Sequence, residues 1–448
     1  MIIKYALGDF IMTTNTKIIK AFRDNVEWRN LLLAGNFGLE MEVNRIQRNG
    51  ELSAQPYPRL FGDRRKHPFL KSDYSEGMIE LVTPVGKSIK EAYDELRYLT
   101  YVLRHELYDN EGLWPLSLPP RVKENDVEWL DTFFEKNWEQ RYHNYLIQRY
   151  GSVHGIISGP HINLAVNQQL IERLFELSGE QDLKQFTNNF YYRIGQGFEA
   201  NRGLLIYLFG ASPINFNDSD QNIPKDLKLG RSIRNSQYGY VNTNEVAIDY
   251  AGDFNEHVDK IRTAVTQGKI FAPSEFYGTV RFKGHGSYED LRDNGIEYLE
   301  LRIIDTNPFD ENGIALADLN IIQFLVAWMI VFNKSYTDNE LVERRKIANQ
   351  VALSDPFELF DFEEQFIDEL KQVNQIFGGY FTKPMLLILE RLKDAKKTPA
   401  GQLMQITKTK IGLHDWARQV ALNRQQAFRN RRQDALTYEK MARLLTGE

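Results

Sequence analysis

The feature that most constrains this chain is the segment FGLEMEVNRI, residues 37–46, in which polar and apolar side chains alternate. Side chains on a β-strand point alternately to opposite faces, so Glu40 and Glu42 would share one face and the apolar residues the other. With a rise of about 3.3 Å per residue, the two carboxylates would stand about 7 Å apart. Like charges this close are stabilised by a divalent cation, an arginine or a shared proton. Taken alone, the pattern also fits a half-solvated strand with two exposed acids.

The same pairing of polar side chains on one face recurs further along the chain. We expect strands at 78–82, 155–166, 275–282 and 296–304, each with one apolar and one polar face. The polar faces carry Glu80, His161, Asn163, Tyr277, Arg281, Glu300 and Arg302. An ordinary solvated strand face more often carries Lys, Thr, Ser and Gln. These faces therefore predict a concave polar surface that holds cations.

The donor set indicates which cation this surface would bind. The chain has no cysteine, and hard oxygen ligands without thiolates favour Mg²⁺ or Mn²⁺ over zinc. Magnesium with few protein ligands usually completes its shell with phosphate oxygens, so carboxylates for metal and arginines for phosphate predict a nucleotide site. Dinucleotide fingerprints, Walker motifs, GxSxG and HExxH are all missing from the sequence. The pattern by itself does not identify the reaction.

Charge and hydropathy exclude several other classes of protein. A net charge of −6 and a pI near 5.9 argue against a general nucleic-acid binder, and the basic run at 429–432 fits a solvated helix face. The first twenty residues lack the long apolar core of a signal peptide, and either Met1 or Met12 would serve as the start. The apolar run 321–332 is too short to span a bilayer and predicts a buried helix. We expect a cytoplasmic protein without membrane attachment.

Most of the remaining chain is predicted to be helical. Helices are expected over 18–33, 126–150 and 168–209, and almost throughout from 315 onwards. A capping box at Ser88 and Glu91 opens another helix that runs to about 108. A further helix follows the loop at 231–242 and ends at about 268. Linkers, low-complexity tracts and internal repeats are missing from the sequence. We therefore predict one α+β domain over 1–448, with the sheet and active site in 34–310 and a helical part in 311–448.

Eight motifs in a fixed order give the chain a family resemblance. GLEMEVNRI resembles the GLExExxRV strand of bacterial glutamate–cysteine ligases. The same order continues with KSDYSEGMIELVTP, LWPLSLPP, RYG…ISGPHIN, YLFGASP, SQYGY, EFYGTVR and GIEYLELRIIDTNPF. The motifs spread over residues 37–309. They are similar to the type found as stand-alone enzymes and as the N-terminal half of fused glutathione-synthesising proteins.

The resemblance implies a fold and a reaction. The fold is a curled, mainly antiparallel sheet forming a cup with helices outside, related in its sheet to glutamine synthetase. The reaction activates the γ-carboxylate of glutamate with ATP to γ-glutamyl phosphate, which the amino group of cysteine then attacks, as the first step of glutathione biosynthesis. The partners implied are glutamate, cysteine and ATP, with no nucleic acid and no membrane, in a monomer or weak homo-oligomer.

The resemblance also implies roles for single residues. The metal-binding positions match Glu40, Glu42, Asp73, Glu80, His161 and Glu300. Asn163 matches a nucleotide or metal contact, Arg302 lies next to the transferring phosphoryl group, and Arg281 is assigned to the nucleotide. Positions around the amino-acid substrates match Tyr142, Arg234, Tyr240 and Tyr277.

Departures from the family pattern keep two other functions open. Gly155 stands where relatives carry a polar residue near the cysteine side chain, and Pro160 replaces an apolar residue before the histidine. These changes favour a ligase that joins glutamate to a different amine. The segment at 343–356 also departs from the family pattern. Together with the basic run at 429–432, it fits a catalytically silent nucleotide- or nucleic-acid-binding relative. Glutathione synthase activity is not expected, because no second ATP-binding domain follows.

Overall fold

A computed structural model describes residues 12–123, 137–217, 220, 222–242, 246, 248–362, 364–407 and 412–430. At its centre lies a seven-stranded sheet with the order β2-β3-β1-β5-β7-β6, and β4 pairs with the far end of β1. The strands are β1 Gly35–Gln47, β2 Leu70–Ser72, β3 Met78–Val82, β4 Glu111–Leu113, β5 Pro160–Val166, β6 Val280–Lys283 and β7 Tyr298–Leu301. All pairings between these strands are antiparallel, as the resemblance implies.

The register of the strands brings the polar residues into rows across one face. Glu42 lies opposite Glu80, and Glu40 lies opposite His161. Glu300 lies between Asn163 on one side and Arg281 on the other. Residues directly opposite each other in an antiparallel pair point to the same face. The alternation predicted for β1 and β3 is therefore confirmed, and pairing gathers both strands' acids on one surface.

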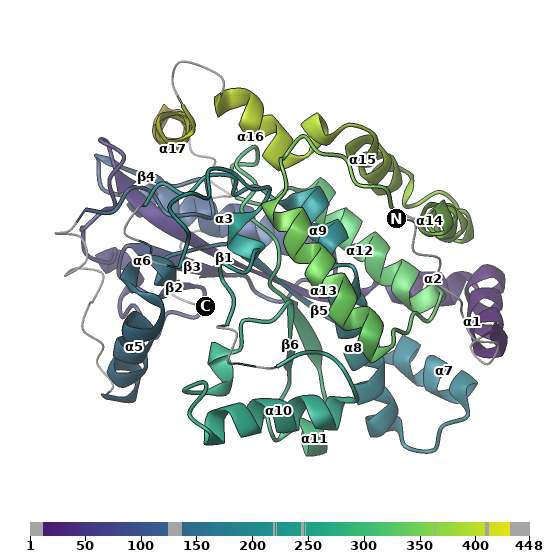
Figure 1. The fold of residues 1–448 in the computed structure, drawn as a ribbon. Helices are drawn as coiled ribbons and strands as arrows, with labels where there is room; N and C mark the ends of the chain where they lie inside the picture. Colours follow the sequence, from purple (N-terminus) through teal and green to yellow (C-terminus); the bar gives the residue numbers. More distant parts are fainter. Residues whose placement is uncertain are drawn as a thin grey trace.

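Helices surround the sheet and form most of the last third of the chain (Figure 1). Up to the last strand they are α1 Met12–Asp24, α2 Val26–Leu33, α3 Ile89–Glu106, α5 Asn137–Tyr150, α6 Ser152–Gly155, α7 Gln168–Ser178, α8 Leu183–Ala200, α9 Arg202–Phe209, α10 Phe254–Thr266 and α11 Leu291–Asn294. After it come α12 Leu316–Val331, α13 Asp338–Leu353, α14 Glu364–Ile376, α15 Thr382–Lys393, α16 Pro399–Thr407 and α17 Leu413–Asn430.

Two predicted helices show how local sequence sets these elements. Ser88 caps α3 by accepting a hydrogen bond from the backbone N–H of Glu91, which satisfies a donor at the helix start. Helix α12 is apolar on all sides, and almost all of it is buried, as predicted for the run 321–332. It packs against α3, α8, α14 and α15 and belongs to an apolar cluster that reaches from Ile18 to Ala395.

Other predicted elements have different limits in the structure. The helix expected over 18–33 is two helices, because Asn25 between them has an extended backbone. The helix expected over 126–150 is described only from Asn137, since residues 124–136 lie outside the described part. The strand expected over 296–304 is shorter, β7. None of the helices among the described residues has the length and hydropathy needed to cross a membrane.

Two predicted strands begin later than expected, and these errors affect the site. The segment predicted as a strand from residue 155 starts with the end of helix α6, and β5 begins only at Pro160. The strand predicted over 275–282 begins at Val280, so Tyr277 lies in the loop before it and does not share a strand face with Arg281. The Tyr250 hydroxyl donates to the carbonyl oxygen of Val280 and accepts from its N–H. Val280 is the first residue of β6 and pairs with Leu301 of β7, and the Tyr250 side chain holds its backbone groups.

Candidate active site

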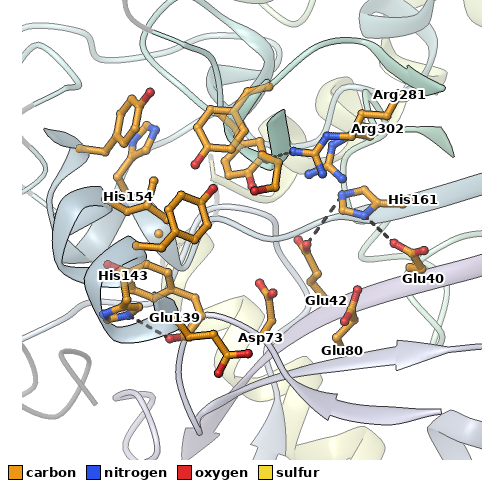
Figure 2. Close-up of a pocket in the computed structure, with 18 of the residues that line it drawn as sticks. Glu40, Glu42, Asp73, Glu80, Glu139, His143, His154, His161, Arg281 and Arg302 are labelled. Atoms are coloured by element: carbon orange, nitrogen blue, oxygen red, sulfur yellow. Dashed lines mark hydrogen bonds and ion pairs between the residues drawn. The ribbon is translucent and has the colours of Figure 1, made fainter. Parts of the chain in front are cut away.

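A cavity of about 430 Å³ opens over the polar face of the sheet. Figure 2 shows Glu40, Glu42 and Glu80 on one side and Glu139, His143 and His154, which belong to α5 and α6, on the other, with Arg281 and Arg302 near His161. The cavity is lined by acids (Glu40, Glu42, Asp73, Glu80, Glu139, Glu300), by bases (Arg65, Arg281, Lys283, Arg302, His143, His154, His161) and by aromatic residues (Tyr74, Trp138, Tyr142, Tyr150, Tyr240, Tyr277). Side chains from all five segments predicted as strands line this cavity, among them Glu40, Glu80, His161, Arg281 and Glu300.

His161, Glu40 and Glu300 lie close enough to share one metal ion. One ligand atom from each lies within 4.8 Å of the others. The Nδ1 atom of His161 is 3.2 Å from Glu40 Oε2 and 3.7 Å from Glu300 Oε1. Asn163 donates from Nδ2 to Glu40 Oε1 at 2.9 Å, which orients that carboxylate. The group has the composition that a Mg²⁺ or Mn²⁺ site requires.

The imidazole of His161 is neutral and presents a free nitrogen. Burial and the positive charge of Arg302 lower the pKa of His161 to about 4. With its lone pair on Nδ1, which faces Glu40 and Glu300, the ring can share their metal ion. The proton is then on Nε2, which is buried without a hydrogen-bond partner among the described residues. Glu42 Oε1 lies 3.7 Å from Nε2. A neutral imidazole whose Nδ1 lone pair lies beside two carboxylate oxygens fits a cation shared by the three side chains.

Glu42, Glu80 and Asp73 form a second group of acids on the same face. Burial and the negative charge of Asp73 raise the pKa of Glu42 well above its usual range. The same two causes raise the pKa of Glu80 to about 8. Burial also raises the pKa of Asp73, although Arg65 and Arg302 oppose it. Buried carboxyl groups that raise each other's pKa favour a divalent cation as their partner.

Arg302 and Lys283 supply positive charge at the other side of Glu300. Arg302 forms an ion pair with Glu300, and Lys283 Nζ lies 2.6 Å from Glu300 Oε2. Burial acts to raise the pKa of Glu300, but Arg302, Arg281 and Lys283 outweigh it and hold that pKa well below its usual range. The guanidinium of Arg302 also lies 5.8 Å from the Tyr240 ring centre. Fixed cations beside a carboxylate suit a site that receives phosphate oxygens.

The tyrosines predicted to contact amino-acid substrates lie together on the opposite wall. The rings of Tyr240 and Tyr277 are 4.3 Å apart, and Tyr277 contacts Tyr150 at 5.6 Å. Tyr142 and Leu146, predicted to share a helix face, both line the cavity from α5. This wall is apolar with a few hydroxyl groups, as small-molecule pockets usually are.

Two predicted site residues lie behind the surface of the cavity. Asn163 and Arg234 are absent from the wall formed by the described residues. Arg234 is buried and donates from one guanidinium nitrogen to the carbonyl oxygens of Arg302, at 3.1 Å, and Ile304, at 3.0 Å. It therefore holds the backbone that carries Arg302, and a substrate contact by Arg234 itself stays a prediction.

Several cavity residues were missed by the sequence reasoning. Lys283 lies two positions after Arg281, so the period of two could have placed it on the same face. Arg65 lies in a loop predicted only as rich in Pro and Arg. Tyr150 and His154 lie at the end of α5 and in α6, where a strand was predicted to follow directly. Sequence pattern offered no signal for these last two, because their position depends on how α5 packs onto the sheet.

Comparison with protein families gives one match over most of the chain. Residues 19–272 and 267–351 match the family described as glutamate-cysteine ligase. The chain is 34% identical over 386 residues to the glutathione biosynthesis bifunctional protein GshAB of Streptococcus thermophilus (strain CNRZ 1066), covering 85% of this chain and 50% of that protein. The protein of the same name from Enterococcus faecalis (strain ATCC 700802 / V583) is 34% identical over 406 residues, covering 86% and 52%. The chain thus spans about half the length of the curated relatives it matches.

Solved structures show the same fold. A bifunctional glutathione synthetase from Pasteurella multocida superimposes with a TM-score of 0.86 and 26% identity, covering 97% of this chain and 58% of that chain. A glutamate–cysteine ligase from Francisella tularensis in complex with AMP superimposes with a TM-score of 0.79 and 21% identity, covering 92% and 93%.

Proposed function

The chain belongs to the glutamate–cysteine ligase family, and we propose that it joins the γ-carboxylate of L-glutamate to the amino group of L-cysteine in an ATP-dependent reaction. The observation that carries this proposal is the composition of the cavity. Five carboxyl groups and His161 lie on the sheet side, fixed cations lie next to them, and a tyrosine-rich wall faces them.

The acids suit the binding of Mg²⁺ or Mn²⁺ together with ATP. Glu40, His161 and Glu300 would hold one ion, and Glu42, Glu80 and Asp73 would bind further positive charge. Such ions neutralise the triphosphate and draw charge from the transferring phosphoryl group. The carboxylates of the chain orient the ions. Arg281 lies opposite Glu300 on the edge strand β6 and would contact the nucleotide.

In the first step, the γ-carboxylate of glutamate attacks the γ-phosphorus of ATP, which forms γ-glutamyl phosphate and releases ADP. Arg302 and Lys283 lie beside Glu300, where they would stabilise the negative charge on the transferring phosphoryl oxygens. In the second step, the amine attacks the acyl carbon and inorganic phosphate leaves. The Tyr142, Tyr240 and Tyr277 wall would hold both amino acids in contact and shield the acyl phosphate from water.

The test is ADP release by the purified protein with Mg²⁺, ATP and glutamate, with and without cysteine. We expect turnover only when both amino acids are present, with γ-glutamylcysteine identified by mass. Cysteine-independent ATP hydrolysis, or silence with every amine, would contradict the proposal. A cytoplasmic location belongs to this proposal, because the reaction needs ATP and a reduced thiol.

A second candidate is ligation of glutamate to a different amine. One specific observation favours it: Gly155 offers no side chain to the cavity, and the ring of Tyr74 fills the space in front of it. A panel of amino acids in the same assay distinguishes the two functions. Turnover with another amine and none with cysteine would retain the first step and reassign the acceptor.

A further inference from the structure

His154 is a buried histidine on the wall of the cavity and has no role in the two proposed reaction steps. Its side chain is 3% exposed, and neither ring nitrogen has a hydrogen-bond partner among the described residues. A buried polar group without a partner costs about 1–3 kcal/mol, and such groups are rare in folded proteins. Since His154 lines the cavity, its missing partner is explained most simply by a bound molecule.

The surroundings of His154 hold its ring in one place. The ring stacks on Tyr150 with 5.7 Å between centres and 15° between planes. Tyr150 contacts Tyr277, which packs on Tyr240, so His154 ends the tyrosine-rich wall. Figure 2 shows it on the far side of the pocket from His161 and Glu40. His154 therefore faces the part of the cavity opposite the acids, where the amine rather than the phosphates would lie.

Asp220 determines which nitrogen of His154 is available. Its Oδ2 lies 3.7 Å from His154 Nδ1, and both side chains are buried. This separation is longer than a hydrogen bond, but a carboxylate facing Nδ1 favours the tautomer with the proton on that nitrogen. The other oxygen of Asp220 accepts from the side chain and the backbone N–H of Asn222, which anchors the carboxylate. The Nε2 lone pair of His154 is then free to accept a hydrogen bond.

The other cavity residue of α6 cannot perform this role. Gly155 has no side chain, and a Cβ atom built there would overlap the Tyr74 ring. His154 is accordingly the polar group that α6 presents to the cavity.

We propose that His154, oriented by Asp220, selects the amine substrate by accepting a hydrogen bond from the end of its side chain. The substrate class is a short amino acid whose side chain ends in a donor, a thiol or a hydroxyl. This inference rests on the proposed function and extends it to the choice of acceptor. His154 acts as a specificity contact and Asp220 as a positioning residue.

The experiment measures kcat/KM for cysteine and for 2-aminobutyrate, which has a methyl group in place of the thiol. In His154→Phe, which keeps a flat ring against Tyr150, the preference for cysteine should fall about tenfold, the value of one hydrogen bond. His154→Gln keeps an acceptor and should retain most of the preference. Asp220→Asn should raise the KM for cysteine with little change in kcat. The KM values for glutamate and ATP should stay unchanged in all three variants.

An unchanged cysteine preference in folded His154→Phe would overturn the proposal, and so would equal increases in KM for all three substrates. If His154→Phe does not fold, Asp220→Asn tests the proposal instead, and an unchanged KM for cysteine in that variant would overturn it. If the wild-type protein shows no turnover with any amine, the proposed ligase function is contradicted, and the His154 contact is tested by binding instead. Calorimetric titration of cysteine and 2-aminobutyrate into wild type and His154→Phe, with Mg²⁺, ADP and glutamate present, then tests the same contact. Equal binding of both ligands by the wild type would overturn it.

Discussion

At the scale of single residues, the cavity acids fall into two electrostatic groups. Glu300 is paired with Arg302 and Lys283, and its pKa is low. Glu42 and Glu80 face other carboxyl groups, and their pKa values are raised. Sequence pattern placed all three on one polar face but treated them as equivalent. Their difference arises from the partners that strand pairing brings to each.

This difference predicts unequal effects on stability of two similar substitutions. Glu42→Gln should leave the free energy of unfolding in EDTA within about 1 kcal/mol of wild type, because the neutral amide replaces a carboxyl group whose charged form burial and Asp73 both disfavour. Glu300→Gln should lower it by about 3 kcal/mol, because Arg302 then loses its buried partner. Both variants should abolish ADP release. Urea unfolding of the two proteins, side by side, is the measurement, and equal stabilities would contradict the assignment.

Gly155 gives a second residue-scale prediction. Gly155→Ala places a methyl group against the Tyr74 ring, so we expect a loss of about 1–3 kcal/mol in stability and a higher KM for the amine. Removing the ring should relieve the overlap, and the double variant Gly155→Ala/Tyr74→Leu should be less affected than the sum of the single changes. A double-mutant cycle by urea unfolding tests this. Strict additivity would show that the two positions do not interact.

At the scale of elements, strands and helices with a regular polar–apolar pattern or a clear capping signal in their own sequence were predicted well. The alternation in β1 and β3 and the cap of α3 are confirmed. The late starts of β5 and β6 were not predictable, because side chains and loops distant in the sequence decide them. Tyr250, for example, bonds across thirty residues to the backbone of Val280, the first residue of β6. Such contacts leave no periodic trace in the segment itself.

Helix α10 carries a prediction about pH. His257 is fully buried among aromatic rings, and this burial lowers its pKa to about 4, below the usual 6.5. Below pH 6.5 the unfolded chain binds the proton first, so the stability from neutral His257 is lost as pH falls from 6.5 toward 4. Between pH 7.5 and 5.5, wild type should lose about 1.4 kcal/mol more than His257→Gln. Urea unfolding at both pH values checks this, and equal losses would contradict it.

At the scale of the whole molecule, one large apolar cluster joins the sheet to helices from α1 to α15. One cluster of buried side chains includes Ile18 in α1, Leu39 in the sheet and Ile388 in α15. We therefore propose that sheet and C-terminal helices form one domain. Thermal unfolding should then show a single transition, with tryptophan fluorescence and far-UV circular dichroism changing together. Two separated transitions would divide the chain into two units.

Metal binding gives a further prediction at this scale. Because the acids on the sheet side of the cavity lie on three strands and a loop, a cation that binds them links distant parts of the fold. Mg²⁺ at about 100 times its dissociation constant adds about 2.7 kcal/mol, so the melting temperature should rise by about 2–5 °C over the value in EDTA. The rise should be smaller in Glu42→Gln. An equal rise in both proteins would place the stabilising ion elsewhere.

The sequence by itself determined which acids and bases share the polar face of each strand, because the two-residue period of a strand is local and can be read from neighbouring residues. It also predicted the apolar helix α12 and the α+β class. Only the tertiary structure decided that Glu40 lies opposite His161, that Glu300 pairs with Arg302 and Lys283, and that His154 closes the tyrosine wall. These facts depend on strand register, which pairs β1 with β5 more than one hundred residues away and β6 with β7, and on how α6 packs against the cavity. The pattern within one segment specifies neither the register nor the packing.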